Sequence, residues 1–254
     1  MAHRGFDLDG RENSMRAFEA AVRLGVDFLE TDVRATVDGV LLAFHDARLN
    51  RVTDRSGRIS EQAWSQVRRA RIGGVEPIPR LEEVLGAWPD VRVNVDLKED
   101  AAVVPFVEAI RRTGTRGRVC VASFSDRRRA AALAALGRDG PVAWSPGVRG
   151  TVRVVTSVRR GPAAVARALA GAPCLQVPPR VAGLQVVTAE LVRAVHAAGA
   201  QVHVWTIDDP ERMRSLLDLG VDGLVTNRSD LALGVLRERS VDRQAPEGAD
   251  GGPA

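Results

Sequence analysis

The chain has 254 residues, of which 45% are hydrophobic and 27% are charged, and its formal net charge is +4. This length suits one barrel-sized domain or two smaller ones, and the composition is that of a soluble globular enzyme. No apolar run is long enough to span a bilayer, and no basic block interleaved with aromatic residues indicates a nucleic-acid partner.

Two features of the sequence indicate the cellular compartment: the residues that follow Met1 and the small number of cysteines. Met1 is followed by Ala2-His3-Arg4 rather than by a signal-peptide pattern. Only two cysteines occur, Cys120 and Cys174, and both lie in apolar contexts, so no disulfide framework is expected. We therefore expect a cytoplasmic protein without stable membrane insertion.

Short apolar runs alternate with amphipathic helical patterns along the chain. We expect strands at residues 2–3, 27–33, 91–98, 118–124, 141–145, 174–179, 201–207 and 221–227. We expect helices at residues 14–25, 101–114, 126–137, 161–171, 188–199, 209–220 and 229–239. Such alternation is typical of βα units around a parallel sheet. Eight units predict a single α/β domain, a (β/α)8 TIM barrel over residues 1–240, followed by a disordered tail at 241–254.

One stretch, "FLETDVRATVDGVLLAFHD" at residues 28–46, breaks this alternation. Its segment "ATVDGVL" is too short for the helical crossover that joins two parallel strands. We therefore expect an antiparallel hairpin around Asp38-Gly39, whose return strand brings His45 to the barrel mouth. Residues 47–80 are expected to form an irregular excursion after this hairpin, with a helix around Trp64.

The same stretch carries two carboxylates in a strand. Side chains alternate along a strand, so Glu30 and Asp32 point the same way, and Asp96 and Lys98 repeat this spacing on the next strand. Buried like charges are costly unless a cation offsets them. Three carboxylates from neighbouring strands form a hard-oxygen cluster suited to Mg²⁺ or Ca²⁺.

Two histidines and two cationic side chains are expected beside this cluster. His3 and His45 flank the carboxylates, and imidazoles can take and give protons near neutral pH. Arg4 and Lys98, the only lysine of the chain, add positive charge where a phosphate could bind. Together these groups predict phosphodiester cleavage at the carboxyl ends of the strands.

An ordered set of short motifs resembles the glycerophosphodiester phosphodiesterase family over nearly the whole chain. The motifs are "HRG" at 3–5, "REN" at 11–13, "ETD" at 30–32, "HD" at 45–46, "VDLK" at 95–98, "SF" at 123–124, "VWT" at 204–206 and "GVDGLVTN" at 220–227. The resemblance implies a (β/α)8 barrel that uses a divalent cation. It implies hydrolysis of glycerophosphodiesters to sn-glycerol 3-phosphate and an alcohol.

The resemblance also assigns roles by position. It implies that the cation is held by Glu30, Asp32 and Asp96. It implies an acid/base pair of His3 and His45, in an order left open, with Arg4 and Lys98 on phosphate oxygens. Trp205 would pack against the glycerol or the leaving group. The implied mechanism is attack by the glycerol 2-hydroxyl, followed by opening of a cyclic phosphate by water.

Four positions depart from the family pattern. Arg11 and Ser14 stand in "RENS" where the family commonly has Pro-Glu-Asn-Thr, and Ser14 or Asn13 can still cap the next helix. Asp96 stands where glutamate is frequent, a change that bears on metal preference more than on reaction class. Asn227 replaces a frequent aspartate.

Other interpretations of the same residues remain open. A lysophospholipase D or sphingomyelinase D-like activity on the same barrel would require an apolar groove for an acyl chain. A catalytically idle phosphodiester-binding protein is the alternative from another class. Lys98 could be a salt-bridge partner of Asp96. His203 could line the barrel, although packing in the core is expected for it. His196 is expected to be a surface or packing residue of a helix.

Overall fold

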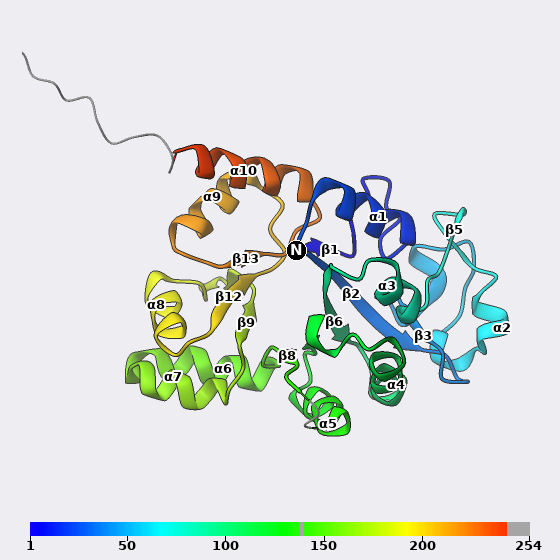
Figure 1. Ribbon diagram of the computed structural model, residues 1–254, viewed down its shortest axis with the longest axis horizontal. Coiled ribbons are helices and arrows are strands. Elements are labelled where there is room, and N and C mark those ends of the chain that lie inside the picture. The colour runs from blue at the N-terminus through cyan, green and yellow to red at the C-terminus, as the bar shows by residue number, and fades with distance from the viewer. Residues whose placement is uncertain (138–139, 243–254) are drawn as a thin grey trace, which may run out of the picture.

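The computed structural model describes residues 1–137 and 140–242 and shows a ring of helices around a central set of strands (Figure 1). Parallel strands occur in every segment where the sequence predicts one. They are β1 (Ala2–His3), β2 (Phe28–Ala35), β6 (Arg92–Leu97), β7 (Val119–Ala122), β8 (Ala143–Trp144), β9 (Cys174–Val177), β12 (Gln201–Val204) and β13 (Gly223–Leu224). The predicted (β/α)8 barrel is confirmed.

These strands pair in the order expected of a barrel. One sheet runs β1–β2–β6–β7–β8 and another β9–β12–β13, with every one of these pairs parallel. A parallel bridge between Ala2 and Thr226 joins β1 to the segment after β13. Between β8 and β9 the backbone N–H of Gln176 donates to Ser145 Oγ at 3.0 Å. The barrel is therefore closed by backbone bonds at one seam and by a side-chain bond at the other.

The hairpin predicted after the second strand is also present. β3 (Leu41–Ala43) pairs antiparallel with β2, with Val33 opposite Ala43. The excursion that follows contains α2 (Trp64–Val67) and an antiparallel pair, β4 (Arg71–Ile72) and β5 (Glu76–Pro77). It has a small core of its own, formed by Leu42, Phe44, Leu49, Ile59, Val67, Ala70, Ile72 and Ile78. The excursion is thus more ordered than the sequence indicated.

The remaining helices surround the barrel. They are α1 (Met15–Leu24), α3 (Leu81–Ala87), α4 (Val103–Thr113), α5 (Asp126–Leu136), α6 (Val148–Ser157), α7 (Pro162–Leu169), α8 (Ala189–Ala197), α9 (Pro210–Asp218) and α10 (Ser229–Asp242). The sequence predicted all of these except α3 and α6. Ser14 caps α1 by accepting from the backbone N–H of Ala17, as expected.

Some boundaries differ from the prediction. α10 runs to Asp242, so Val241 and Asp242 belong to a helix, and residues 243–254 of the predicted tail lie outside the described residues. A short antiparallel hairpin that the sequence did not indicate, β10 (Arg180–Val181) with β11 (Leu184–Gln185), follows β9.

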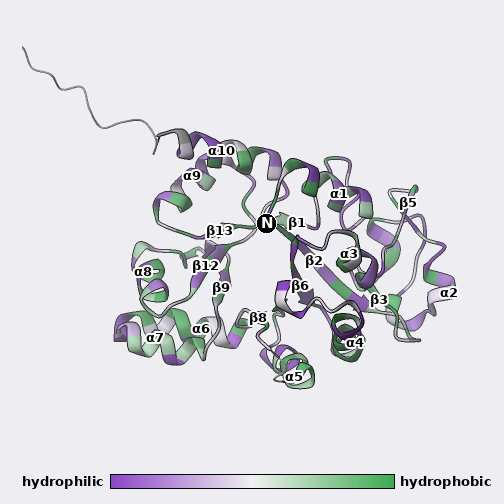
Figure 2. Cartoon of the chain, in the orientation of Figure 1, coloured by the Kyte–Doolittle hydropathy of each residue, from purple (hydrophilic) through white to green (hydrophobic). Residues whose placement is uncertain are grey.

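The hydrophobic core lies between the strands and the helices. One cluster packs β1, β2, β6 and β7 against α1, α3, α4 and α5, and another packs β9, β12 and β13 against the later helices. The outer helices carry both hydrophobic and hydrophilic stretches (Figure 2), as amphipathic helices that cover a sheet do. Among the described helices, none has the length and apolar character needed to cross a membrane.

Candidate active site

A cavity of about 470 Å³ opens at the carboxyl ends of the barrel strands. This is the end at which barrels of this type carry their sites. The cavity brings together every side chain that the sequence predicted for the site. Its lining includes His3, Arg4, Glu30, Asp32, His45, Asp96, Lys98 and Trp205.

The three predicted carboxylates are buried together. Asp32 and Asp96 are partners in the ladder between β2 and β6, and Glu30 is two residues before Asp32 on β2. Lys98 Nζ lies 2.7 Å from Asp32 Oδ1 and 2.7 Å from Asp96 Oδ2. The expected salt bridge between Lys98 and Asp96 is therefore present, but the ammonium is shared with a second carboxylate.

Burial and mutual repulsion act strongly on these groups. Burial, together with the charges of Asp32 and Asp96, raises the pKa of Glu30 well above its usual range. Burial also raises the pKa of Asp96, against the opposing effect of Lys98. The pKa of Asp32 is lowered in spite of its burial, because Lys98 and Arg4 stabilise its charged form. The cluster sets three carboxyl groups against the two cationic side chains Arg4 and Lys98, so a further cation would stabilise the ionised forms of Glu30 and Asp96.

Two oxygens of the cluster are left without a hydrogen bond. Asp96 Oδ1 is buried and unpartnered, and Asp32 Oδ2 lies 3.0 Å from Arg4 Nε but outside hydrogen-bond geometry. Across residues 1–137 and 140–242, no three histidine, cysteine or carboxylate side chains converge at the spacing of a formed metal site. The three carboxyl groups and the two unpartnered oxygens fit a hard divalent cation. In this structure the ammonium of Lys98 lies between two of these groups, Asp32 and Asp96.

Arg4 is held at the mouth by a tight turn after β1. Its φ of 58° and the φ of 86° at Gly5 are left-handed. A Cβ at Gly5 would lie 2.8 Å from the Cβ of Ala17 in α1, so this position requires glycine. The backbone N–H of Arg4 donates to Glu30 Oε2 at 3.1 Å, and its guanidinium donates to Glu12 Oε1 at 2.9 Å. The turn therefore fixes both the backbone and the side chain.

His3 is oriented by a pair of residues after β13 and β12. Asn227 Nδ2 donates to Asp208 Oδ2 at 2.8 Å, which turns the amide oxygen of Asn227 toward His3 Nδ1 at 2.7 Å. We infer from this arrangement that Nδ1 of His3 carries the proton and donates it. Its Nε2 lies 3.9 Å from Glu30 Oε2, within the cavity. Burial lowers the pKa of His3 below its ordinary value.

His45 is oriented by a network of charged residues. Its Nδ1 lies 2.6 Å from Asp46 Oδ1, and Arg51 Nε donates to the other oxygen of Asp46 at 2.6 Å. Arg51 also donates to Glu12 at 2.6 Å, and Glu12 accepts from Arg4. Hydrogen bonds from Arg51 and His45 lower the pKa of Asp46 to about 2. The sequence did not predict the role of Arg51, because a lone arginine in an irregular segment carries no distinctive signal.

Trp205 lines the same cavity and lies beside Phe124. The two rings meet edge to face, with their centroids 5.6 Å apart. Lys98 Nζ lies 5.5 Å from the centroid of Phe124. The aromatic pair therefore adjoins the charged cluster.

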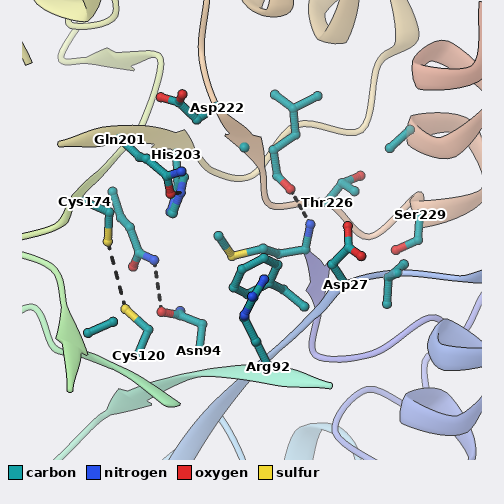
Figure 3. A pocket seen from close by; sticks show the side chains of 18 of the residues that line it. Asp27, Arg92, Asn94, Cys120, Cys174, Gln201, His203, Asp222, Thr226 and Ser229 are labelled. Carbon is teal, nitrogen blue, oxygen red and sulfur yellow. Dashed lines mark hydrogen bonds between the residues drawn. The ribbon is translucent and has the colours of Figure 1, made fainter. Parts of the chain in front are cut away.

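A second and larger cavity, of about 540 Å³, lies at the other end of the barrel (Figure 3). Buried His203 and the free thiols Cys120 and Cys174 line it, with the two sulfur atoms 4.0 Å apart. Asn94 and Gln176 line both cavities and are joined by a hydrogen bond of 2.9 Å. This cavity lacks the clustered carboxylates and cations of the first, so its larger size does not make it the better candidate.

The two remaining histidines differ in how they match expectation: His196 lies on a helix surface as expected, whereas His203 lines the second cavity rather than packing closely in the core. His203 is buried in the barrel interior, with its Nδ1 unpartnered among the described residues. His196 lies on the outer face of α8 and pairs with Asp222 at 2.8 Å. Neither lies in the cavity with His3 and His45.

The fold and the site define a (β/α)8-barrel phosphoric diester hydrolase. Comparison with protein families matches residues 3–231 to the glycerophosphoryl diester phosphodiesterase family. The chain belongs to this family, as the motifs predicted. It is 44% identical over 241 residues to the "Probable glycerophosphodiester phosphodiesterase 2" of Mycobacterium tuberculosis, covering 94% of this chain and 90% of that protein.

Solved structures confirm the fold. A phosphodiesterase of Oleispira antarctica, in complex with the product sn-glycerol-3-phosphate, is similar with a TM-score of 0.77 and 22% identity. The match covers 93% of this chain and 95% of that one. A glycerophosphodiester phosphodiesterase of Thermotoga maritima is similar with a TM-score of 0.70 and 23% identity, covering 93% of this chain and 96% of that one.

Proposed function

We propose that the chain hydrolyses glycerophosphodiesters to sn-glycerol 3-phosphate and an alcohol in the cavity at the carboxyl ends of the strands. The observation that carries this proposal is that one cavity holds both His3 and His45 with the buried carboxylates and the cations Arg4 and Lys98. Family membership and the names of its relatives support the substrate class. The product bound to the Oleispira enzyme is the product proposed here.

The two histidines are proposed to move the protons of the reaction. In each ring Nδ1 is engaged, by Asn227 in His3 and by Asp46 in His45, so Nε2 is the nitrogen left for substrate. One ring would take the proton of the glycerol 2-hydroxyl, and the other would protonate the departing alcohol. Water would then open the cyclic phosphate with the two roles exchanged. Such transfers contribute about 10²–10⁴-fold each.

The cationic side chains are proposed to hold the phosphate. Arg4 presents a planar guanidinium and Lys98 a compact ammonium, and both line the cavity. Both already neutralise buried carboxylates, so they are fixed before a substrate arrives. Fixed positive charge stabilises the charge that develops on the phosphoryl oxygens.

We also propose a divalent cation, Mg²⁺ or Ca²⁺, held by Glu30, Asp32 and Asp96. Its support is the excess of buried carboxylates, the raised pKa of Glu30 and the unpartnered oxygens of Asp32 and Asp96. A bound cation would supply Lewis-acid stabilisation of a phosphoryl oxygen.

The test is release of sn-glycerol 3-phosphate from glycerophosphocholine and glycerophosphoethanolamine, with Mg²⁺, Ca²⁺ or EDTA present. We expect release from both diesters with a divalent ion and loss of release in EDTA, with recovery when the ion is restored. Absence of release from folded protein with any ion would contradict the proposal. Equal release in EDTA would contradict only the proposed requirement for a divalent cation, and the proposed hydrolysis would stand.

A further inference from the structure

His45 is held through its backbone as well as through its ring. The Nε of Arg34 donates to the backbone carbonyl oxygen of His45 at 2.7 Å. Arg34 is the next-to-last residue of β2, whereas His45 is the second residue after β3. This bond therefore fastens the return strand of the hairpin to the strand that carries Glu30 and Asp32.

Arg34 is itself held by Glu99, the second residue after β6. Glu99 Oε2 accepts from Arg34 Nη1 at 3.0 Å, and Glu99 Oε1 accepts from the backbone N–H of Ala35 at 2.9 Å. The side chains of Arg34 and Glu99 are only 15% and 22% exposed. Charge-assisted hydrogen bonds of this kind are short and strongly directional. The pair therefore fixes the guanidinium that holds His45.

The Arg34–Glu99 pair connects two segments of the site that have no strand pairing with each other. Glu99 directly follows Lys98, whose ammonium lies in the charged cluster. Among the described strands, β3 and β6 each pair with β2 and not with one another. The pair is therefore a side-chain link between the segment of His45 and the segment of Lys98.

Neither Arg34 nor Glu99 is among the described residues that line the active-site cavity. Both can therefore act on the reaction only through the groups that they hold. The ring of His45 is oriented separately, because its Nδ1 lies 2.6 Å from Asp46 Oδ1. Two sets of partners thus fix this histidine, one at its ring and one at its backbone.

We propose that Arg34 and Glu99 are positioning residues that fix the place of His45 relative to Lys98 and the phosphate site. This inference rests on the proposed function of the same cavity. Arg34 holds the backbone of His45, and Glu99 holds Arg34. A displacement of a catalytic group by about 1 Å can lower a rate by about 10²-fold. Loss of this link should therefore slow the chemical step without removing any group that touches the substrate.

The first test compares Arg34→Met with Arg118→Met. Arg118 is a matched control because it is also half-buried and donates to a backbone carbonyl, that of Val91 at 2.7 Å, outside the active-site cavity. We expect Arg34→Met to lower kcat for glycerophosphocholine about tenfold and to change KM by less than about twofold. Arg118→Met should change neither.

Two conservative variants grade the effect. Arg34→Lys keeps the charge but not the forked guanidinium, so its kcat should lie between those of the unaltered chain and Arg34→Met. Glu99→Gln keeps the shape of the side chain but replaces an acceptor by a donor facing Arg34, so kcat should fall about threefold. Unchanged kcat in both Arg34→Met and Glu99→Gln would overturn the inference.

A double-mutant cycle with His45→Ala shows whether the effect passes through His45. Because Arg34 acts by placing this histidine, Arg34→Met should lower the residual kcat of His45→Ala by less than about twofold. A tenfold loss in both backgrounds would overturn the inference, since Arg34 would then act independently of His45.

Amide hydrogen exchange tests the same link without substrate. Residues 41–46 should exchange about tenfold faster in Arg34→Met than in the unaltered chain or in Arg118→Met, as loss of a hydrogen bond from a charged donor predicts. Equal exchange in all three proteins would overturn the inference at any level of activity. Faster exchange in Arg34→Met, with no hydrolysis by the folded unaltered chain, would contradict the proposed function and leave the fixing of His45 by Arg34 standing.

Discussion

Asp32 and Asp96 occupy facing positions on neighbouring parallel strands, and the ammonium of Lys98 lies 2.7 Å from a carboxylate oxygen of each. Two buried carboxylates at this spacing would repel each other in a medium of low dielectric constant. The shared ammonium offsets that repulsion and makes the floor of the cavity stable. It also places a positive charge where we propose that the phosphate of a substrate binds.

Removal of this ammonium should weaken both folding and activity. Lys98→Met leaves buried carboxylates without their cation, so we expect the free energy of unfolding to fall by about 3 kcal/mol in urea titrations. Activity should be lost as well. The control is Arg23→Met, because the Arg23–Glu19 pair is exposed and should contribute under about 0.5 kcal/mol. Equal unfolding midpoints for the two variants would contradict the role of Lys98.

The orientation of His3 should depend on the pairing of Asn227 with Asp208. The amide of Asn227 now donates to Asp208 at 2.8 Å, and in Asn227→Asp the two carboxylates of residues 227 and 208 would face each other instead. Because His3 would lose its fixed orientation, kcat should fall about tenfold with little change in KM. Adding Asp208→Asn restores one donor between the two side chains, and kcat should recover. The measurement is a double-mutant cycle on glycerophosphocholine hydrolysis. Purely additive losses in that cycle would show that this pair does not position His3.

We expect the ionisation of Asp46 to make the free energy of unfolding depend on pH in the acid range. Its pKa is about 2 in the folded protein against an ordinary value of 3.8, so its contribution is present above pH 4 and is lost as the pH falls toward 2. We expect Asp46→Asn to lower the free energy of unfolding by about 1 kcal/mol at pH 7, a figure reduced for partial exposure.

The check is urea unfolding of both proteins between pH 3 and pH 7. The difference between Asp46→Asn and the unaltered chain should shrink as the pH falls. Glu19→Gln, in an exposed helix pair, serves as the control and should change little at any pH. A difference for Asp46→Asn that is constant across the range would contradict the assignment.

Divalent cations should stabilise the protein through the buried carboxylates. Binding to the folded state alone raises stability by about 1.4 kcal/mol at ten times the dissociation constant, which shifts the thermal midpoint upward. We expect this shift with Mg²⁺ or Ca²⁺ in the unaltered chain and in Glu19→Gln, and its loss in Glu30→Gln. The readout is thermal unfolding and needs no substrate. An equal shift in Glu30→Gln would place the ion elsewhere.

The sequence predicted the barrel because its strands and helices alternate with clear local patterns. The hairpin at β2–β3 was predictable for the same reason, since the link at Asp38-Gly39 is too short for a crossover. Helix α6 was missed because its valines and threonines resemble a strand locally. Packing against α7 and β9 decides its conformation instead.

The charged residues and the aromatic pair of the site were predictable, and the aliphatic part of its lining was not. Glu30, Asp32, Asp96 and Lys98 repeat with the period of a strand, so their common face follows from local geometry. Val148, Val152 and Val181 come from a helix and a hairpin that the sequence did not indicate, and only the closed barrel brings them together. Likewise, the link between Asn227 and His3 spans almost the whole chain and depends on the closure of β1 onto the segment after β13.

The measurement that tests the central claim most directly is release of sn-glycerol 3-phosphate from glycerophosphocholine by the unaltered chain and by His3→Ala, His45→Ala and His196→Ala. His196 is paired with Asp222 outside the cavity and serves as the matched control. We predict that His3→Ala and His45→Ala each lose about 10²–10⁴-fold in kcat while remaining folded, and that His196→Ala keeps its activity. Equal activity in all of these proteins would contradict catalysis by the histidines of this cavity.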